Sequence, residues 1–325
     1  MTKQNIQAFC RFYLYDLCHI LKQTEVRKTD RRLEQASRYI PPSVRAPLAA
    51  LDRQTQGQSE ELRLRVGQPL YLTVCGREQA IGSHRITPQD VQETLQKAAE
   101  YSMHTYADSL RQGFLTVQGG HRIGVGGQTA VEEGTIHSYR HVSSLNIRIA
   151  RQIIGAAKKE LLSQTADTDR LHNVLIFSPP GRGKTTLLRD MARQLSDSGI
   201  RTALADERCE LAALYEGVPQ FDIGAHTDVL DGCPKAQAAM ILLKTMSPQL
   251  LVLDELTSEQ DSYAAEYAAH CGTAVLASAH AWDVHDLLTR PLYQKLRKAA
   301  VFDRIFCIQR DRSVRCVTEQ EGNHA

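Results

Sequence analysis

The chain has 325 residues, of which 42% are apolar and 23% are charged, a balance that is typical of a globular protein and excludes an intrinsically disordered one. Its length suits two domains better than one, because a single hydrophobic core stops growing efficiently near about 250 to 300 residues. The formal net charge is only +2, so the electrostatics do not require a nucleic-acid partner, and we expect none.

The sequence also predicts a cytoplasmic protein. No apolar run approaches the roughly 20 residues that cross a bilayer, and the first residues lack the apolar core of a signal peptide. The eight cysteines include no Cys-x-x-Cys pair and show no metal-ligand spacing with histidine. We therefore expect reduced thiols rather than disulfides or a zinc site.

Residues 1–56 predict an N-terminal helical segment. An aromatic cluster near its start is followed by a charged run from Arg27 to Arg32; the cluster consists of Phe9, Phe12, Tyr13 and Tyr15. Neighbouring basic and aromatic side chains are compatible with a helix at a membrane surface. A helix that packs on the following domain is the simpler interpretation, and we favour it.

Residues 57–150 predict a small α+β domain. The polar and apolar alternation at 61–66, followed by a turn and the apolar run 70–74, is typical of a β-hairpin. Thr87, which precedes a proline, indicates the N-cap of a helix. Further strands are expected at 113–117, 119–124 and 144–149.

A linker is expected at 151–170, where a helical pattern from 150 to 162 gives way to a polar stretch. Beyond it, residues 171–320 alternate between short apolar runs and helical patterns. The expected strands are 173–177, 201–205, 250–253 and 273–278, and the expected helices are 184–197, 234–246 and 260–270. This alternation predicts an α/β domain with a parallel sheet and helices on both faces.

The first strand of this domain runs into a predicted phosphate-binding loop. The loop consists of Ser178, Pro179, Pro180, Gly181, Arg182, Gly183, Lys184, Thr185 and Thr186. Two glycines let successive N–H groups point at one anion, and the positive end of the following helix adds to the attraction. Lys184 is predicted to reach the β- and γ-phosphates of ATP, and Thr185 to bind Mg²⁺. Serine replaces the usual first glycine, a small change that we expect to be tolerated.

Two carboxylates end the strand 250–253. In a sheet of buried parallel strands, the carboxyl end of this strand should lie at the same edge as the phosphate loop. We therefore predict that Asp254 holds the magnesium ion and that Glu255 orients or deprotonates the attacking water. The alternative is that the two acids only cap the next helix.

Two further strand ends reach the same edge. Asp206, Glu207 and Glu210 follow the strand 201–205, and Glu207 is a second candidate for the catalytic carboxylate. His280 follows the strand 273–278 and is predicted to sense the γ-phosphate, although a lone histidine is more often structural.

The acidic group at 206–211, the strand ending in Asp254 and the Ser-Ala-His-Ala at 278–281 resemble the motifs of type II and type IV secretion ATPases, which are RecA-like P-loop NTPases. More specific segments resemble the stage III sporulation protein AA family, and this resemblance extends from about residue 60 to 310. These segments are Gly119–Arg122, Ser143–Arg151, Gly217–Gln220, Thr227–Lys235 and Met246–Pro248.

The resemblance implies a homo-oligomeric, hexameric ATPase in the mother cell of an endospore-forming bacterium, bound through membrane proteins of a channel complex to the inner membrane face. In a ring, Arg148, Arg140 and Arg151 could approach a neighbour's phosphate loop, and Arg148 is the first candidate. Arginine suits this role because its planar fork holds two phosphate oxygens. An equally weighted alternative is that these arginines only face solvent or pair locally.

The sequence departs from the family at His226 and Ser258, where arginines are common, at Thr257, where glycine is common, and at Arg182, which replaces a smaller residue. An arginine near a transferring phosphate can raise the rate by about 10³ to 10⁵. Slow turnover, or a scaffold that binds ATP without hydrolysing it, is therefore an alternative to a motor ATPase. A RecA-like nucleic-acid motor is a third interpretation, which would require a basic groove with aromatic platforms.

Overall fold

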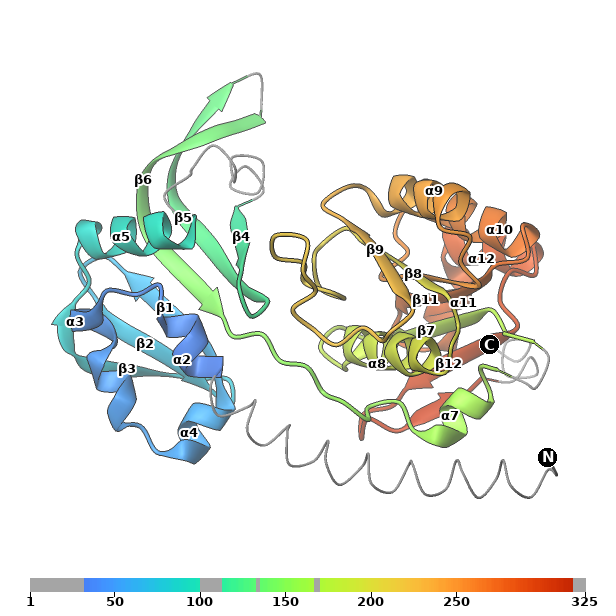
Figure 1. The fold of residues 1–325 in the computed structure, drawn as a ribbon, viewed down its shortest axis with the longest axis horizontal. Coiled ribbons are helices and arrows are strands. Elements are labelled where there is room, and N and C mark those ends of the chain that lie inside the picture. The colour runs from blue at the N-terminus through green and yellow to red at the C-terminus, as the bar shows by residue number, and fades with distance from the viewer. Residues whose placement is uncertain (1–31, 100–112, 133–134, 167–169, 318–325) are drawn as a thin grey trace. The chain divides into compact units, whose positions relative to one another are not determined.

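A computed structural model describes residues 32–99, 113–132, 135–166 and 170–317. They form two compact units, of which the first ends at Arg151 and the second begins at Gln152 (Figure 1). None of the helices in these ranges is long and apolar enough to span a membrane. The aromatic cluster at Phe9 to Tyr15 lies outside the described residues.

The first unit contains a six-stranded antiparallel sheet (Figure 1). Its strands are β1 (Ser59–Arg65), β2 (Pro69–Val74), β3 (Arg77–Arg85), β4 (Phe114–Val117), β5 (His121–Glu132) and β6 (Thr135–Arg148), in the order β3-β2-β1-β6-β5-β4. The predicted hairpin is confirmed, because β1 and β2 pair antiparallel with Leu62 opposite Leu72. The strand β3 was not predicted, since only Ile81 of its nine residues is buried.

Helices cover the buried face of this sheet. They are α2 (Arg32–Ser37), α3 (Pro42–Arg45), the 3₁₀ helix η1 (Ala46–Ala50) and α5 (Pro88–Ala98). A further helix, α4 (Arg53–Gln58), has no buried residue. Leu33, Ile40 and Leu48 share one apolar core with the strand residues Leu62 and Ile147. The described residues before 57 are thus helical in short pieces and pack on the sheet. The predicted cap of α5 is confirmed by a capping box between Thr87 and Asp90.

The second unit contains a seven-stranded sheet in the order β13-β12-β7-β11-β10-β8-β9. Its strands are β7 (Val174–Ser178), β8 (Thr202–Asp206), β9 (Thr227–Asp231), β10 (Leu250–Leu253), β11 (Ala274–His280), β12 (Arg304–Ile308) and β13 (Val314–Cys316). Neighbouring strands run parallel except β12 and β13. The predicted parallel sheet is confirmed, and the antiparallel edge and β9 were not predicted.

Helices lie on both faces of this sheet (Figure 1), as its two apolar clusters show. They are α7 (Lys159–Ser163), α8 (Lys184–Asp197), α9 (Lys235–Thr245), α10 (Glu259–His270), α11 (Val284–Thr289) and α12 (Pro291–Lys298). Successive strand residues point to opposite faces, so Leu175 and Phe177 pack with α9 to α12, while Val174 and Ile176 pack with α7 and α8. The helix predicted at 184–197 has the predicted bounds.

The helix predicted at 150–162 is wrong for most of its length, because residues 151–158 form no helix and only Lys159–Ser163 is helical. Gly155 has a positive φ of 80°, which a right-handed helix does not accommodate. Asp190 accepts a hydrogen bond of 2.8 Å from the N–H of Ala157, and Gln194 donates one of 2.8 Å to its carbonyl. These two side chains of α8 satisfy the backbone groups that a helix would have paired within itself.

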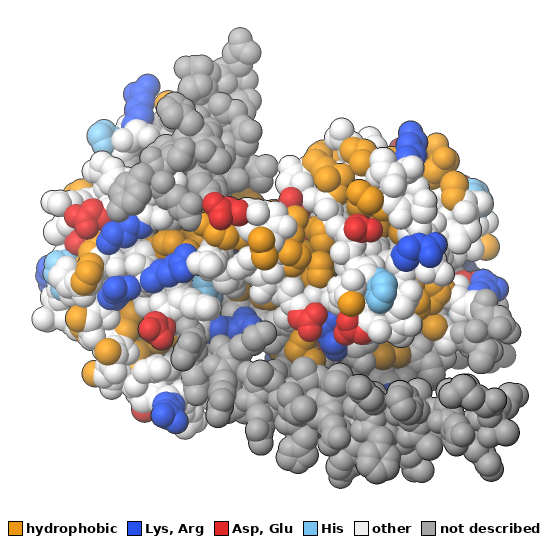
Figure 2. All heavy atoms as spheres, in the orientation of Figure 1, with side chains coloured by type: hydrophobic (Ala, Val, Ile, Leu, Met, Phe, Trp, Pro, Cys, Tyr) orange, Lys and Arg blue, Asp and Glu red, His pale blue; other side chains and the backbone are white. Residues whose placement is uncertain are grey.

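Charged side chains of both signs are interspersed on the face of the molecule that Figure 2 shows. This distribution agrees with the formal net charge of +2.

We predict that Asp190→Ala destabilises the second unit by about 3 kcal/mol, because it leaves the buried guanidinium of Arg193 without one of its carboxylates. Asp197→Ala is the matched control, since Asp197 pairs with the same arginine but its side chain is 44% exposed. Loss of that ion pair should cost less than about 1 kcal/mol. Urea denaturation of the full chain measures both costs in free energy of unfolding. Pulsed hydrogen exchange of peptides from the second unit reports the unfolding of that unit. Equal costs for the two variants would contradict the prediction.

Candidate functional site

The predicted phosphate loop joins β7 to α8, the connection that a phosphate-binding loop requires. Gly181 and Gly183 have positive φ angles of 74° and 96°, and a Cβ atom at either position would meet no atom within 4 Å. The loop is therefore open in front of both glycines. Gly183 is the N-cap of α8, and no side chain caps the helix. The first N–H groups of α8 are thus left for an anion, as ATP binding requires.

Two departures in the loop have simple structural explanations. Ser178 is the last residue of β7 and is fully buried, so its extended backbone does not need glycine. Arg182 is half-buried and donates a hydrogen bond of 3.3 Å to the carbonyl of Arg310.

Lys184 lies beneath the loop with only 4% of its surface exposed. Its Nζ donates hydrogen bonds of 3.0 and 3.2 Å to the carbonyls of Ser178 and Pro179, and lies 2.9 Å from Nδ1 of His280. Burial lowers the pKa of Lys184, and the charges of Glu255 and Asp254 oppose this shift. The ammonium group is therefore held at the loop by protein oxygens, beside the acidic pair.

The predicted magnesium ligands lie next to each other. Thr185 Oγ1 donates a hydrogen bond of 2.8 Å to Asp254 Oδ2. A threonine hydroxyl and a carboxylate are hard oxygen ligands, which suit Mg²⁺ together with phosphate oxygens. Thr185 lies at the start of α8, beside the open glycine loop, and Asp254 contacts it there. The residues present therefore fit a magnesium nucleotide.

Glu255 lies one residue further, between two basic side chains. Its Oε1 is 2.6 Å from His280 Nε2, and its Oε2 accepts a hydrogen bond of 2.7 Å from Arg208. Burial raises the pKa of Glu255, but the hydrogen bond to His280 and the charges of His280, Arg208 and Lys184 outweigh it, so that the pKa is lowered. The carboxylate is thus kept ionised, as a group that orients or deprotonates water must be.

The acidic group after β8 divides into a structural and an accessible part. Asp206 is buried and accepts hydrogen bonds from the N–H groups of Glu210, Leu211 and Ala212 at 2.8 to 3.0 Å. Burial raises the pKa of Asp206, and these N–H groups oppose the rise. Asp206 therefore folds the loop that follows it. Glu207 has a side chain that is 41% exposed, and it lines a small hollow with Asp254 and Glu255.

Three residues at this edge were missed by sequence reasoning: Arg208, Lys235 and Ser278. Lys235 is the first residue of α9 and is 4% exposed, with Nζ 2.6 Å from the carbonyl of Glu255. Its Nζ also lies 3.4 Å from Glu207 and 3.7 Å from Asp261. Arg208 adjoins the acids that were predicted, but no sequence pattern shows that its side chain turns towards β10.

Thr257, Ser258 and His226 form local structural contacts. Ser258 is the N-cap of α10 and forms a capping box with Asp261, which also accepts a hydrogen bond of 2.9 Å from the N–H of Thr257. His226 precedes β9, and its Nδ1 lies 3.0 Å from the carbonyl of Ser196. Since β9 runs parallel to β8, His226 lies at the amino edge of the sheet, opposite the phosphate loop of its own chain.

The candidate arginines all belong to the first unit. Arg148 ends β6, has a side chain that is 63% exposed and lies 3.8 Å from Glu61. Arg151 donates a hydrogen bond of 2.7 Å to the carbonyl of Ser59. Arg140 is exposed on β6. The weak ion pair of Arg148 leaves its guanidinium accessible to another acceptor.

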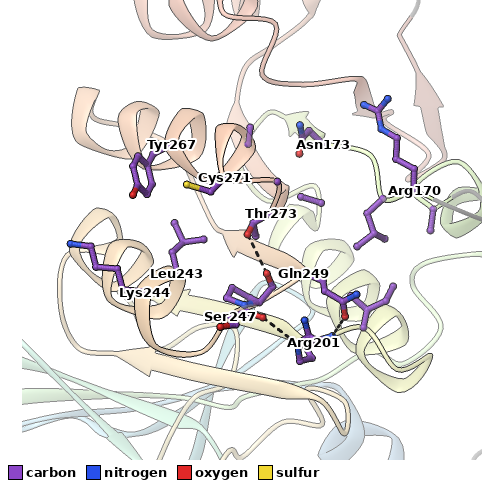
Figure 3. Close-up of a pocket in the computed structure, with 17 residues that line it drawn as sticks. Arg170, Asn173, Arg201, Leu243, Lys244, Ser247, Gln249, Tyr267, Cys271 and Thr273 are labelled. Carbon is purple, nitrogen blue, oxygen red and sulfur yellow. Dashed lines mark hydrogen bonds between the residues drawn. The ribbon is translucent and has the colours of Figure 1, made fainter.

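A separate hollow of about 870 Å³ lies at the amino edge of the parallel sheet (Figure 3). Arg201 donates a hydrogen bond of 3.1 Å to the carbonyl of Ser247, and Thr273 donates one of 3.1 Å to the carbonyl of Pro248. Arg170, Arg201 and Lys244 supply its basic groups. Of the described residues that line it, none is a predicted site residue.

Known proteins of solved structure share the fold of this chain. The Legionella pneumophila ATPase DotB is 16% identical, with a TM-score of 0.54 over 86% of this chain and 83% of that one. The pilus retraction motor PilT, solved with bound ADP, is 14% identical, with a TM-score of 0.52 over 79% of this chain and 76% of that one. The fold is therefore that of the RecA-like secretion ATPases.

Sequence relatives identify the family. Stage III sporulation protein AA of Bacillus subtilis (strain 168) is 36% identical over 300 residues, which cover 90% of this chain and 96% of the relative. The model of the family described as "Sporulation stage III, protein AA" matches residues 30–324. The chain belongs to the Sporulation stage III, protein AA family.

Proposed function

We propose that this protein is a magnesium-dependent ATP hydrolase of the secretion-motor type. The observation that carries the proposal is the hydrogen bond of 2.8 Å between Thr185 and Asp254, at the start of the helix that follows the phosphate loop. This contact unites the two predicted Mg²⁺ ligands, and the ionised carboxylate of Glu255 follows directly in the chain. Binding groups and a candidate base thus meet at one edge of the sheet.

Each residue has a separate role in this proposal. ATP supplies the phosphoryl group that is transferred, and Mg²⁺ supplies positive charge at its phosphate oxygens. The N–H groups of the loop and Lys184 hold the phosphates, while Thr185 and Asp254 hold the metal. Glu255 orients and deprotonates the water, and Glu207 is the second candidate for this role.

His280 completes the candidate site. It lies between Lys184 Nζ, at 2.9 Å, and Glu255 Oε1, at 2.6 Å. A side chain that contacts both the phosphate-binding lysine and the catalytic carboxylate can couple the presence of the γ-phosphate to the position of the carboxylate. We propose this sensing role for His280.

We further propose that the chain works as a homo-oligomer, a hexameric ring. The ring would energise or assemble the channel between mother cell and forespore during endospore formation. It would lie in the mother-cell cytoplasm, held at the inner membrane face by membrane proteins of the channel. The family supports the sporulation role, and the shared fold with DotB and PilT supports a motor.

Lys184→Ala should weaken binding of Mg-ATP by about 100-fold, since hydrogen bonds to charged groups contribute about 1.5 to 3 kcal/mol each. Isothermal titration calorimetry measures this change. Lys244→Ala, an exposed lysine at the opposite edge of the same unit, is the matched control and should bind like the wild type. Unchanged affinity for Mg-ATP in a folded Lys184→Ala protein would show that the predicted loop does not bind the phosphates.

Glu255→Gln should bind Mg-ATP normally but hydrolyse it about 10² to 10⁴ times more slowly, because the amide retains the shape and loses the charge that activates water. Release of inorganic phosphate at saturating ATP measures the rate. Glu160→Gln, on the exposed surface of α7, is the control for loss of one carboxylate. If Glu255→Gln turned over like the wild type, the catalytic carboxylate would have to be sought at Glu207 or Glu210.

Arg148→Ala tests whether the first unit supplies a cation to a neighbouring subunit. Lys184→Ala subunits keep this arginine, and Arg148→Ala subunits keep the phosphate loop. If Arg148 acts across the subunit boundary, mixed rings should hydrolyse ATP although neither parent does. A mixture that demonstrably assembles and stays as inactive as its parents would exclude Arg148, and the same design then applies to Arg140 and Arg151.

A further inference from the structure

The backbone of Glu255 adopts an uncommon conformation. Its φ angle is +53°, in the left-handed region that residues with a Cβ atom disfavour. A non-glycine residue remains there only where the surrounding structure holds it. The groups that contact the main chain of Glu255 must therefore hold it in this conformation.

Ser278 contacts the chain at this point from the neighbouring strand. Leu253 pairs with Ala277, so the parallel register of β10 and β11 brings Ser278 beside the end of β10. The N–H of Glu255 donates a hydrogen bond of 2.9 Å to Ser278 Oγ, and the N–H of Leu256 donates one of 2.9 Å to the Ser278 carbonyl. Ser278 thus holds two successive N–H groups as the chain leaves the strand.

The same hydroxyl also contacts the proposed metal ligand. Ser278 Oγ donates a hydrogen bond to Asp254 Oδ1, while Asp254 Oδ2 accepts the hydrogen bond from Thr185. The hydroxyl is fully buried, so no solvent competes for it. One side chain therefore fixes both the Asp254 carboxylate and the Glu255 backbone.

Lys235 holds the other side of the same peptide. Its Nζ donates a hydrogen bond of 2.6 Å to the carbonyl of Glu255. Glu207 at 3.4 Å and Asp261 at 3.7 Å balance its buried charge. Because Asp261 also caps α10, Lys235 connects the turn at Glu255 to the start of the next helix.

We propose that Ser278 and Lys235 are positioning residues that hold Glu255 in its left-handed conformation, and so aim its carboxylate at His280 and the phosphate loop. This inference rests on the catalytic role proposed for Glu255. Neither positioning side chain needs to touch ATP, since the hydroxyl and the ammonium group bind acceptors and donors of the protein itself. Their effect on hydrolysis passes through Glu255.

A purely structural role would leave different traces. If Ser278 only satisfied a buried carboxylate, its loss would lower stability or nucleotide affinity and would slow an enzyme lacking Glu255 as much as the wild type. A positioning role changes the rate with little change in KM, and its effect disappears once the carboxylate is gone. The double-mutant cycle between Ser278 and Glu255 separates these two roles.

The first experiment needs no nucleotide. Hydrogen exchange of the peptide that contains Glu255 and Leu256 should become faster in Ser278→Ala, which lacks the acceptor for the Glu255 N–H, and should stay close to wild type in Ser278→Thr, which retains a hydroxyl. A crystal structure of Ser278→Ala should show φ of Glu255 outside the left-handed region. Unchanged exchange together with an unchanged φ would overturn the proposal.

The second experiment measures ATP turnover. Ser278→Ala should lower kcat by about 10- to 100-fold with KM changed less than about threefold, because misplacing a catalytic group by about 1 Å has an effect of this size. In the Glu255→Gln background the same change should alter kcat by less than about threefold. Lys235→Met should behave like Ser278→Ala, and Lys235→Arg should recover part of the rate.

The outcomes separate the positioning role of Ser278 and Lys235 from the catalytic role of Glu255. If Glu255→Gln is slow but Ser278→Ala and Lys235→Met turn over like wild type, or if their effects multiply fully with that of Glu255→Gln, the positioning role is wrong and the proposed function stands. If Glu255→Gln itself turns over like wild type, the catalytic role of Glu255 fails, and with it this inference.

Discussion

The candidate site depends on the two hydrogen bonds that Thr185 and Ser278 donate to the carboxylate of Asp254. It joins the helix of the phosphate loop to the ends of two adjacent parallel strands. Ser178, His280 and Glu255 occupy the same edge because β7, β11 and β10 are neighbours in register. The sheet order thus brings separate sequence motifs together at one edge of the sheet.

Local patterns explain what could be predicted. The apolar run of β10 and the amphipathic pattern of α8 indicate a strand and a helix without reference to the rest of the chain, and both have the predicted bounds. The meeting of the strand ends at one edge was predicted, but the individual contacts that Lys235 and Ser278 make there were not. Nothing near Lys235 in the sequence indicates that its side chain reaches the carbonyl of Glu255, and Ser278 was noticed only as part of a motif that ends in His280.

Other differences arise where local signals compete with tertiary contacts. The segment before Leu162 has a helical pattern, yet Asp190 and Gln194 bind the backbone of Ala157, and residues 151–158 form no helix. The hydroxyl of Ser258 caps α10, a role that an arginine side chain does not fill.

The chain belongs to a sporulation family and has the fold of secretion motors. Our central proposal is that the carboxyl edge of the second unit hydrolyses ATP. The most direct measurement is inorganic phosphate release by the purified wild-type chain over a range of Mg-ATP concentrations. The account predicts release that saturates with ATP and stops when EDTA removes magnesium. Calorimetric binding of Mg-ATP without any phosphate release, in an assembled oligomer, would contradict it and favour a scaffold that only binds ATP.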